Sequence, residues 1–382
     1  MYLSNAAYFD FAATTPVDER VVQTVLHFMR EEFGNSGSRT HAYGVNARNA
    51  VEAARRSVAD VVGATDDEVI FTSGATESDN LAILGLAAHL ESVGRRHIIT
   101  SAVEHKAVLE PLEYLESKGF EVTYLGVDES GLVNSVELAS GLREDTGLVS
   151  IMHVNNETGV IQPLADLAAV LSDHPAFFHV DAAQGFGKEL DLLRLPRIDL
   201  ISISGHKIYA PKGVGALVTR KRHGRERLPI EPLMYGGGQE RGLRPGTVPV
   251  ALVAGLGEAA RIAILDYQRR LEAARQVEQK VLEFVEAAGG TINGDRSRSI
   301  PNIVNASFRG LDSEAFIVAT KSLVAISNGA ACSSHAYERS HVLEAMNIET
   351  WRVGGAVRFS FSHESSLPDS DELVRIIESV RF

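Results

Sequence analysis

The stretch Ile198-Asp199-Leu200-Ile201-Ser202-Ile203 runs directly into Ser204-Gly205-His206-Lys207. The mostly apolar first part predicts a buried β-strand, and the small residues that follow predict a tight turn at its carboxyl end. Such a turn holds the amine of Lys207 at a fixed point and leaves backbone N–H groups free for an anion. Lys207 taken alone could equally be a solvated residue after a strand, so its role depends on the rest of the chain.

Short apolar and β-branched runs lie on both sides of this strand. Together with it they predict strands over 68–72, 97–101, 121–126, 148–154, 177–180, 200–204 and 214–219. Helical patterns, for example over 106–118 and 164–172, separate several of them. Strands that alternate with helices predict an α/β fold with a mainly parallel sheet covered on both faces. The functional residues of such a sheet collect at the carboxyl ends of its strands.

The second half of the chain has a different pattern. Residues 250–288 are almost continuously helical and contain no proline, which predicts a helix pair leading to a second domain. Residues 301–382 then read as strand, helix, strand, helix, strand and helix. We therefore expect a large domain over 16–260 and a small α+β domain formed by 1–15 and 261–382.

Charge and cysteine content argue against several classes of protein. The chain has 37 basic and 50 acidic residues and a net charge of −13, so direct nucleic-acid binding is not expected. Cys332 is the only cysteine, which rules out an intramolecular disulfide and suits a reducing cytosol. We find no signal peptide and no apolar run near the ~20 residues of a membrane span. These features predict a cytoplasmic protein without a membrane partner.

Two strand ends carry residues that suit a phosphorylated, nitrogen-containing ring. Ser73-Gly74-Ala75-Thr76-Glu77 predicts a turn and a helix start, which can bind a phosphate or be an ordinary capped helix. Asp181 follows the strand at 177–180, and it is costly to bury unless it faces a donor or a cation such as a protonated pyridine. A helix N-cap is the alternative for Asp181. Gln184 could donate to a ring oxygen.

Two more strand ends add polar groups. Asn155 and Asn156 could bind a carboxylate or a ring hydroxyl, or could build a turn. His105 stands at a helix start, where it could stack on a ring, shuttle protons or be structural. The phosphate cradle, the pyridinium partner, the hydroxyl donor and the lysine together match the requirements of pyridoxal 5'-phosphate (PLP).

Five motifs carry a family resemblance. They are Tyr8-Phe9-Asp10-Phe11-Ala12-Ala13-Thr14-Thr15-Pro16, Ser73-Gly74-Ala75-Thr76-Glu77, Asn155-Asn156-Glu157, Ser204-Gly205-His206-Lys207 and Gly236-Gly237-Gly238-Gln239-Glu240-Arg241. Over nearly the whole chain they resemble the cysteine desulfurases, which are class V aminotransferases of PLP fold type I. The resemblance implies a large domain with a mainly parallel seven-stranded sheet and a small α+β C-terminal domain. It also implies a homodimer that removes sulfur from L-cysteine, releases L-alanine and passes a persulfide to an acceptor protein.

The resemblance also implies roles for individual residues. The cofactor ligands would be Ala75, Thr76, His105, Asn155, Asp181, Gln184, Ser204, His206, Lys207 and Thr247. Lys207 would bind PLP covalently and move protons, and His105 would stack on the ring. Thr247 would reach the phosphate of the neighbouring subunit. Asn155 and Arg358 would hold the substrate carboxylate, the arginine through two parallel hydrogen bonds. No metal ligands are predicted.

The nucleophile implied by the resemblance is Cys332, in a mobile segment around 327–338. Its thiolate would take the sulfur of the substrate. The segment departs from the family pattern, because Ala330 stands where serine is typical. Phe11 also replaces the usual asparagine, and 34–38 lacks the usual proline. Ser327 ends the apolar run at 323–326, and it would be the nucleophile's position only if it replaced a native cysteine.

Two alternatives to a cysteine desulfurase stay open from the sequence. Another class V enzyme, a selenocysteine lyase or an aminotransferase, would not need the mobile cysteine. A non-catalytic scaffold would need none of Lys207, Asp181 and Cys332. The sulfur could serve iron–sulfur clusters, tRNA thiolation or DNA phosphorothioation. We expect phosphorothioation, with transfer through another protein because the chain is acidic.

Overall fold

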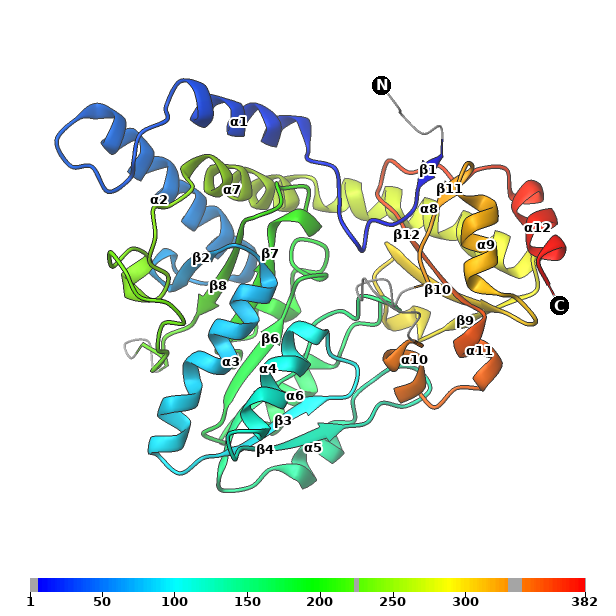
Figure 1. The fold of residues 1–382 in the computed structure, drawn as a ribbon, viewed down its shortest axis with the longest axis horizontal. Helices are drawn as coiled ribbons and strands as arrows, with labels where there is room; N and C mark the ends of the chain where they lie inside the picture. Colours follow the sequence, from blue (N-terminus) through cyan, green and yellow to red (C-terminus); the bar gives the residue numbers. More distant parts are fainter. Residues whose placement is uncertain (1–5, 223–226, 329–338, 382) are drawn as a thin grey trace.

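The computed structural model describes residues 6–222, 227–328 and 339–381 of the 382-residue chain. Its larger lobe is built on a seven-stranded sheet (Figure 1). In spatial order the strands are β2 (Val69–Thr72), β8 (Gly215–Thr219), β7 (Leu200–Ser204), β6 (Phe177–Asp181), β5 (Thr146–Ser150), β3 (His97–Ser101) and β4 (Glu121–Leu125). Only β8 runs antiparallel to its neighbours. The predicted α/β fold with a mainly parallel seven-stranded sheet is confirmed.

Helices cover both faces of this sheet. They are α1 (Glu19–Arg30), α2 (Ala42–Val62), α3 (Ala75–Ser92), α4 (Lys106–Glu116), α5 (Ser135–Gly141), α6 (Leu164–Val170) and α7 (Val250–Leu265). Successive side chains of a strand point to opposite faces. Accordingly, Ile201 packs in a core with α2 and α7, whereas Leu200 packs in a separate core with α3 and α4. Both faces are therefore dry, and polar residues concentrate at the strand ends.

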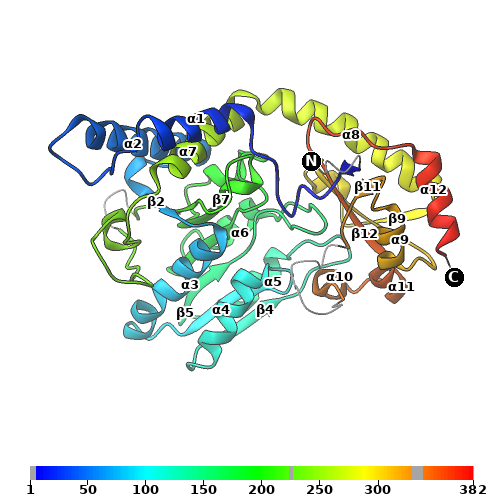
Figure 2. The same ribbon diagram turned by 45° about the horizontal axis from the view of Figure 1, so that its top comes forward.

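The smaller lobe contains an antiparallel sheet of β9 (Gly290–Asn293), β10 (Ile303–Phe308) and β12 (Ala356–Ser360), with β10 in the middle. Its helices are α8 (Tyr267–Ala287), α9 (Ser313–Thr320), α10 (His341–Ala345), α11 (Thr350–Gly354) and α12 (Ser370–Ser379). Phe284, Phe308, Phe316 and Phe359 fill its core. Figure 2 shows α7 and α8 end to end along both lobes. The two helices predicted over 250–288 separate at Asp266.

The N-terminal segment connects the lobes. Strand β1 (Ala7–Tyr8) pairs with β11 (Val324–Ala325) of the smaller lobe, and Phe9 lies in its core. A few residues later, the Thr15 N–H donates to the carbonyl oxygen of His206 in the larger lobe. The domain boundaries proposed from the sequence stay a prediction.

Short 3-10 turns complete the fold: η1 (Asp66–Glu68), η2 (Leu192–Arg194), η3 (Gly205–Lys207), η4 (Glu240–Gly242) and η5 (Arg296–Arg298). Among the described residues, none of the helices has both the length and the apolar character that a membrane span requires.

Candidate active site

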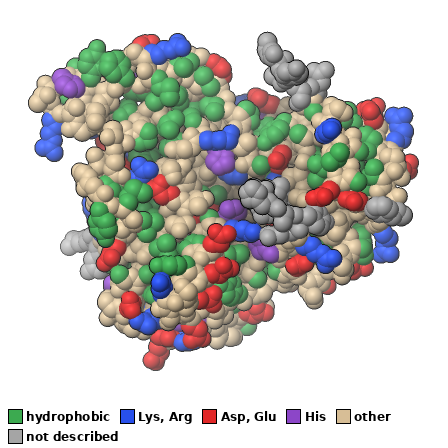
Figure 3. All heavy atoms as spheres, in the orientation of Figure 1, with side chains coloured by type: hydrophobic (Ala, Val, Ile, Leu, Met, Phe, Trp, Pro, Cys, Tyr) green, Lys and Arg blue, Asp and Glu red, His purple; other side chains and the backbone are tan. Residues whose placement is uncertain are grey.

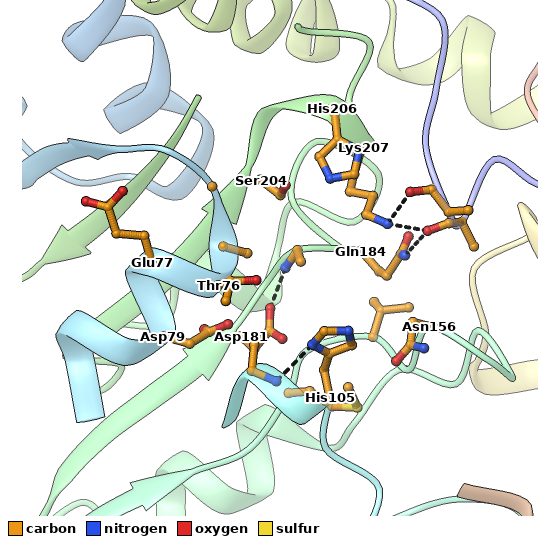
Figure 4. Close-up of a pocket in the computed structure, with 18 of the residues that line it drawn as sticks. Thr76, Glu77, Asp79, His105, Asn156, Asp181, Gln184, Ser204, His206 and Lys207 are labelled. Atoms are coloured by element: carbon orange, nitrogen blue, oxygen red, sulfur yellow. Dashed lines mark hydrogen bonds between the residues drawn. The ribbon is translucent and has the colours of Figure 1, made fainter. Parts of the chain in front are cut away.

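A cavity of about 570 Å³ lies at the carboxyl ends of β6 and β7, beside the start of α3 (Figure 4). Histidine side chains follow the junction between the two lobes on the face shown in Figure 3. Most of the predicted ligands line the cavity, namely Ala75, Thr76, His105, Asp181, Gln184, Ser204, His206, Lys207 and Arg358. Residues far apart in the sequence meet here because parallel strands end at the same edge of the sheet.

Lys207 ends the η3 turn directly after β7, as the opening stretch predicts. Its Nζ donates to the carbonyl oxygens of Ala12 and Ala13, the latter at 2.8 Å. The amine therefore points into the cavity toward the N-terminal segment, as Figure 4 shows. Its placement suits an amine that must reach a bound aldehyde.

The opposite end of the cavity offers hydrogen-bond donors for an anion. Helix α3 begins at Ala75, after Gly74, which has no side chain to cap its first N–H groups. Ser204 and His206 also line the cavity, and Nδ1 of His206 lies 3.1 Å from Oγ1 of Thr14. Burial and the positive charge of Lys207 lower the pKa of His206 to about 4, so its ring is neutral at pH 7. A phosphate fits this combination of helix dipole and N–H groups.

Asp181 supplies a buried negative charge. It is 5% exposed, and one of its oxygens accepts a 2.8 Å hydrogen bond from the N–H of Ala183. Burial, followed by the nearby charge of Asp79, raises the pKa of Asp181 to about 6. A cationic ring nitrogen beside this carboxylate would relieve both effects. The buried carboxylate, the free helix start and the lysine together fit PLP.

Gln184 and His105 have fixed orientations. Nε2 of Gln184 donates to the carbonyl oxygen of Ala12 at 2.8 Å, and its Oε1 accepts from Nζ of Lys188 at 3.3 Å. His105 is the N-cap of α4, where its Nδ1 accepts from the N–H of Ala107 at 3.1 Å. Its ring thus lines the cavity while one nitrogen anchors the helix.

The structure separates the roles of the two neighbouring asparagines. The Asn155 side chain is 1% exposed and builds a turn: its Oδ1 accepts from the N–H groups of Glu157 and Thr158, and its Nδ2 donates to the carbonyl of Val103. It does not line the cavity, whereas Asn156 does. The structure thus places Asn156 at the cavity and uses the polar atoms of Asn155 in the turn, while the ligand role expected for Asn155 stays a prediction. No spacing rule distinguishes the two from sequence.

Arg358 reaches the cavity from β12 of the smaller lobe. Its Nη2 lies 2.7 Å from Oδ1 of Asp10, and its Nη1 donates to the carbonyl of Asn156 at 3.0 Å. Its Nε has no hydrogen-bond partner within the described part of the chain. The guanidinium is therefore held in place through both of its Nη atoms.

Two other predicted site residues do not line the cavity, and a third is not among the described residues. Thr247 is exposed and does not line this chain's cavity. Ser327 is 5% exposed, and its backbone pairs with that of Arg358. Cys332 and most of the predicted nucleophile segment lie outside the described residues. The roles given to all three stay predictions.

Comparisons with known proteins identify the family. The family model for class-V aminotransferases matches residues 7–373. The chain belongs to the class V aminotransferase family. The cysteine desulfurase IscS of Escherichia coli O139:H28 is 45% identical to this class V aminotransferase over 375 residues, covering 96% of this chain and 91% of IscS. The resemblance drawn from the motifs is confirmed, and PLP is the cofactor of the family.

Solved structures agree with this assignment. A NifS-like protein superposes with a TM-score of 0.89 at 36% identity, covering 98% of this chain and 99% of its own. DndA from Streptomyces lividans superposes with a TM-score of 0.82 at 51% identity, covering 96% of this chain and 100% of its own. Sequence reasoning passed over three polar residues at or beside the cavity of this class V aminotransferase: Asp79, Lys188 and Asp10. Asp79 lines the cavity one helical turn inside α3, a position that no local motif marks.

Proposed function

We propose that this PLP-dependent cysteine desulfurase removes sulfur from L-cysteine, releases L-alanine and carries the sulfur on Cys332 to an acceptor protein. The observation that supports it best is the meeting of Lys207, Asp181 and the free start of α3 around one cavity. PLP, when bound, withdraws electrons from the amino acid attached to it. The chain's own residues must hold it, orient the substrate and move protons.

Lys207 supplies the amine that holds the cofactor and that moves protons once the substrate has displaced it. Asp181 would hold a negative charge beside the ring nitrogen, and Gln184 would donate to the ring oxygen. The N–H groups of Ala75 and Thr76, with Ser204 and His206, would hold the phosphate. The ring of His105, which lines the cavity, would cover one face of the cofactor.

Arg358 and Asn156 recognise the substrate carboxylate. The Arg358 guanidinium provides charge-assisted donors, and the Asn156 side chain lines the same cavity (Figure 4). An amino acid bound there has its amine toward Lys207. This arrangement selects α-amino acids without contacting their side chains. Cys332 therefore distinguishes L-cysteine from other amino acids, because its thiolate reacts with the substrate sulfur.

Two copies of the chain complete the site. The exposed Thr247 follows the glycine-rich 236–246 segment and is free to contact a second subunit. For the destination of the sulfur we favour DNA phosphorothioation, which the likeness to DndA supports. The chain's net charge of −13 favours delivery through a protein acceptor over direct contact with DNA.

Incubation of the PLP-loaded protein with L-cysteine tests the proposal. Alanine and sulfide should form in equal amounts with a thiol present, and Cys332→Ser should abolish both, the first turnover included, because no thiolate accepts the substrate sulfur. Ser327→Cys serves as the matched control and should leave the rate of the wild-type chain unchanged. Turnover that survives Cys332→Ser would point to a selenocysteine lyase or an aminotransferase, and a protein that binds no PLP would leave the scaffold alternative.

A further inference from the structure

Lys188 is a second lysine near the cavity, and the functional assignment does not use it. It lies in the turn that follows β6, four residues after Gln184. Its Nζ donates to Oε1 of Gln184 at 3.3 Å. Within the part of the chain that the structure describes, no carboxylate pairs with Lys188, so Gln184 is the polar side chain that it contacts.

This contact decides which way the Gln184 amide points. A carboxamide can rotate by half a turn and exchange its oxygen with its NH2 group at nearly the same shape. On one side, the carbonyl of Ala12 can only accept a hydrogen bond, and it receives one from Nε2 at 2.8 Å. On the other side, the Lys188 ammonium can only donate. In the reversed orientation, the Gln184 oxygen would face the Ala12 carbonyl oxygen, and the Gln184 NH2 group would face the Lys188 ammonium. Both contacts would be repulsive.

The same carbonyl also connects Gln184 to Lys207. The Ala12 oxygen accepts from both Nε2 of Gln184 and Nζ of Lys207 (Figure 4). Lys188, Gln184, the Ala12 carbonyl and Lys207 thus form one chain of contacts from the wall of the cavity to its reactive amine. Burial and the charge of Lys207 lower the pKa of Lys188 to about 7. The neutral amine still donates to Oε1, and the Ala12 carbonyl demands the same amide orientation.

We propose that Lys188 is a positioning residue: it holds the Gln184 amide with its NH2 group toward the cavity, ready to donate to the ring oxygen of PLP. The inference rests on the cofactor role proposed for Gln184. Without Lys188, only the Ala12 carbonyl holds this orientation, so the reversed amide, whose oxygen would repel the ring oxygen, becomes more populated.

The test compares PLP binding to the apo forms of wild type, Lys188→Met, Lys188→Arg, Gln184→Ala and the double variant. Fluorescence titration gives Kd, and the visible absorption band of the loaded protein reports on the ring oxygen. Lys188→Met should raise Kd about fivefold to tenfold, the equivalent of one hydrogen bond, and should move the band toward that of Gln184→Ala. Lys188→Arg keeps a donor and should stay within about twofold of wild type.

The double variant distinguishes the positioning role of Lys188 from the cofactor-binding role of Gln184 on which it rests. If Lys188 acts through Gln184, adding Lys188→Met to Gln184→Ala should change Kd by less than about twofold. Additive losses, or a Lys188→Met protein with unchanged Kd and band, would overturn the role of Lys188 alone. A Gln184→Ala protein that matches wild type would overturn the role of Gln184 and the inference with it. If Lys188→Met does not fold, as judged by circular dichroism, Lys188→Ala replaces it with the same expected shifts.

Discussion

Arg358 and Asp10 form an ion pair whose Nη2···Oδ1 distance is 2.7 Å, with the arginine side chain 3% exposed. The pair joins the third strand of the smaller sheet to the N-terminal segment at the edge of the cavity. Asp10 restrains the guanidinium through Nη2 and makes no hydrogen bond with Nε. In the role proposed for Arg358, the substrate carboxylate would meet an arginine that is already ordered, so little side-chain entropy would be lost on binding.

Substitution Arg358→Gln should raise KM for L-cysteine by about tenfold to a hundredfold, because a charge-assisted hydrogen bond is worth about 1.5–3 kcal/mol. The change in kcat should be smaller. Steady-state kinetics of alanine release measures both quantities. Arg375→Gln on the exposed face of α12 is the matched control and should leave both unchanged. An unaltered KM in Arg358→Gln would remove this residue from substrate recognition.

Replacement of Lys207 by alanine should abolish turnover by at least about a thousandfold, because both the covalent attachment and the proton carrier are lost. Borohydride reduction followed by mass spectrometry provides a second readout. It should fix the mass of the cofactor to the wild-type chain and not to Lys207→Ala. Lys321→Ala, at an exposed position after α9, should behave as wild type. Fixation of the cofactor to the Lys207→Ala chain would show that another lysine holds it.

Asp79 predicts a pH-dependent stability of the apo protein. It is fully buried, and burial raises its pKa to about 7. The folded state thus keeps a proton that the unfolded state loses near pH 4. Below pH 4 this group does not lower the free energy of unfolding. As the pH rises from 4 through 7, the free energy of unfolding falls because the folded state must give up that proton. Asp79→Asn should therefore stabilise the apo protein by about 1–4 kcal/mol at pH 8 and have little effect at pH 4. Denaturant unfolding at the two pH values measures this difference.

The matched control for Asp79 is Asp173→Asn, which removes an exposed carboxylate from the end of α6. It should shift stability by less than about 0.5 kcal/mol at either pH. Equal effects of Asp79→Asn at pH 4 and pH 8 would contradict the assignment of a buried, protonated carboxyl.

Glu240 should anchor the segment that carries Thr247. Its carboxylate pairs with Arg55, at 2.8 Å from Nη2, and accepts from the N–H of Phe71 at 2.8 Å. Glu240→Ala leaves the buried arginine without this partner and should cost about 3–5 kcal/mol by denaturant unfolding. Glu52, a partly exposed residue 3.5 Å from Nε of Arg55, is the control. Glu52→Ala should cost less than about 1 kcal/mol, and a similar cost for both variants would refute the anchor.

Much of the larger lobe follows from hydrophobic pattern. The strands at 97–101 and 200–204 have the predicted bounds, because each carries buried isoleucines and ends at small polar residues. The strand predicted over 148–154 begins earlier and stops at Ser150. From Ile151 to Val154 the chain stays buried, and the N–H groups of Ile151 and His153 still donate to carbonyl oxygens of β6 although the strand has ended. Hydrophobicity alone cannot place that boundary.

The site was harder to predict where contacts between distant segments decide it. Lys207, Asp181 and Gln184 follow strands and could be found one by one. Asn156 could not be distinguished from Asn155 by position, because the choice depends on which amide the local turn uses. The contacts of Arg358 with Asp10 and of Lys188 with Gln184 depend on rotamers and tertiary packing, which sequence patterns do not encode.

The pairing of Asp10 with Arg358, 348 positions apart, also sets the order in which the protein can mature. During synthesis the strands of the larger lobe leave the ribosome well before β12 does. The lysine, the aspartate and the helix start can then assemble while the arginine that reads the substrate is still missing. A chain released too early would have the means to capture PLP but not to select an amino acid, so competence for the reaction arrives only with the final stretch of the polypeptide.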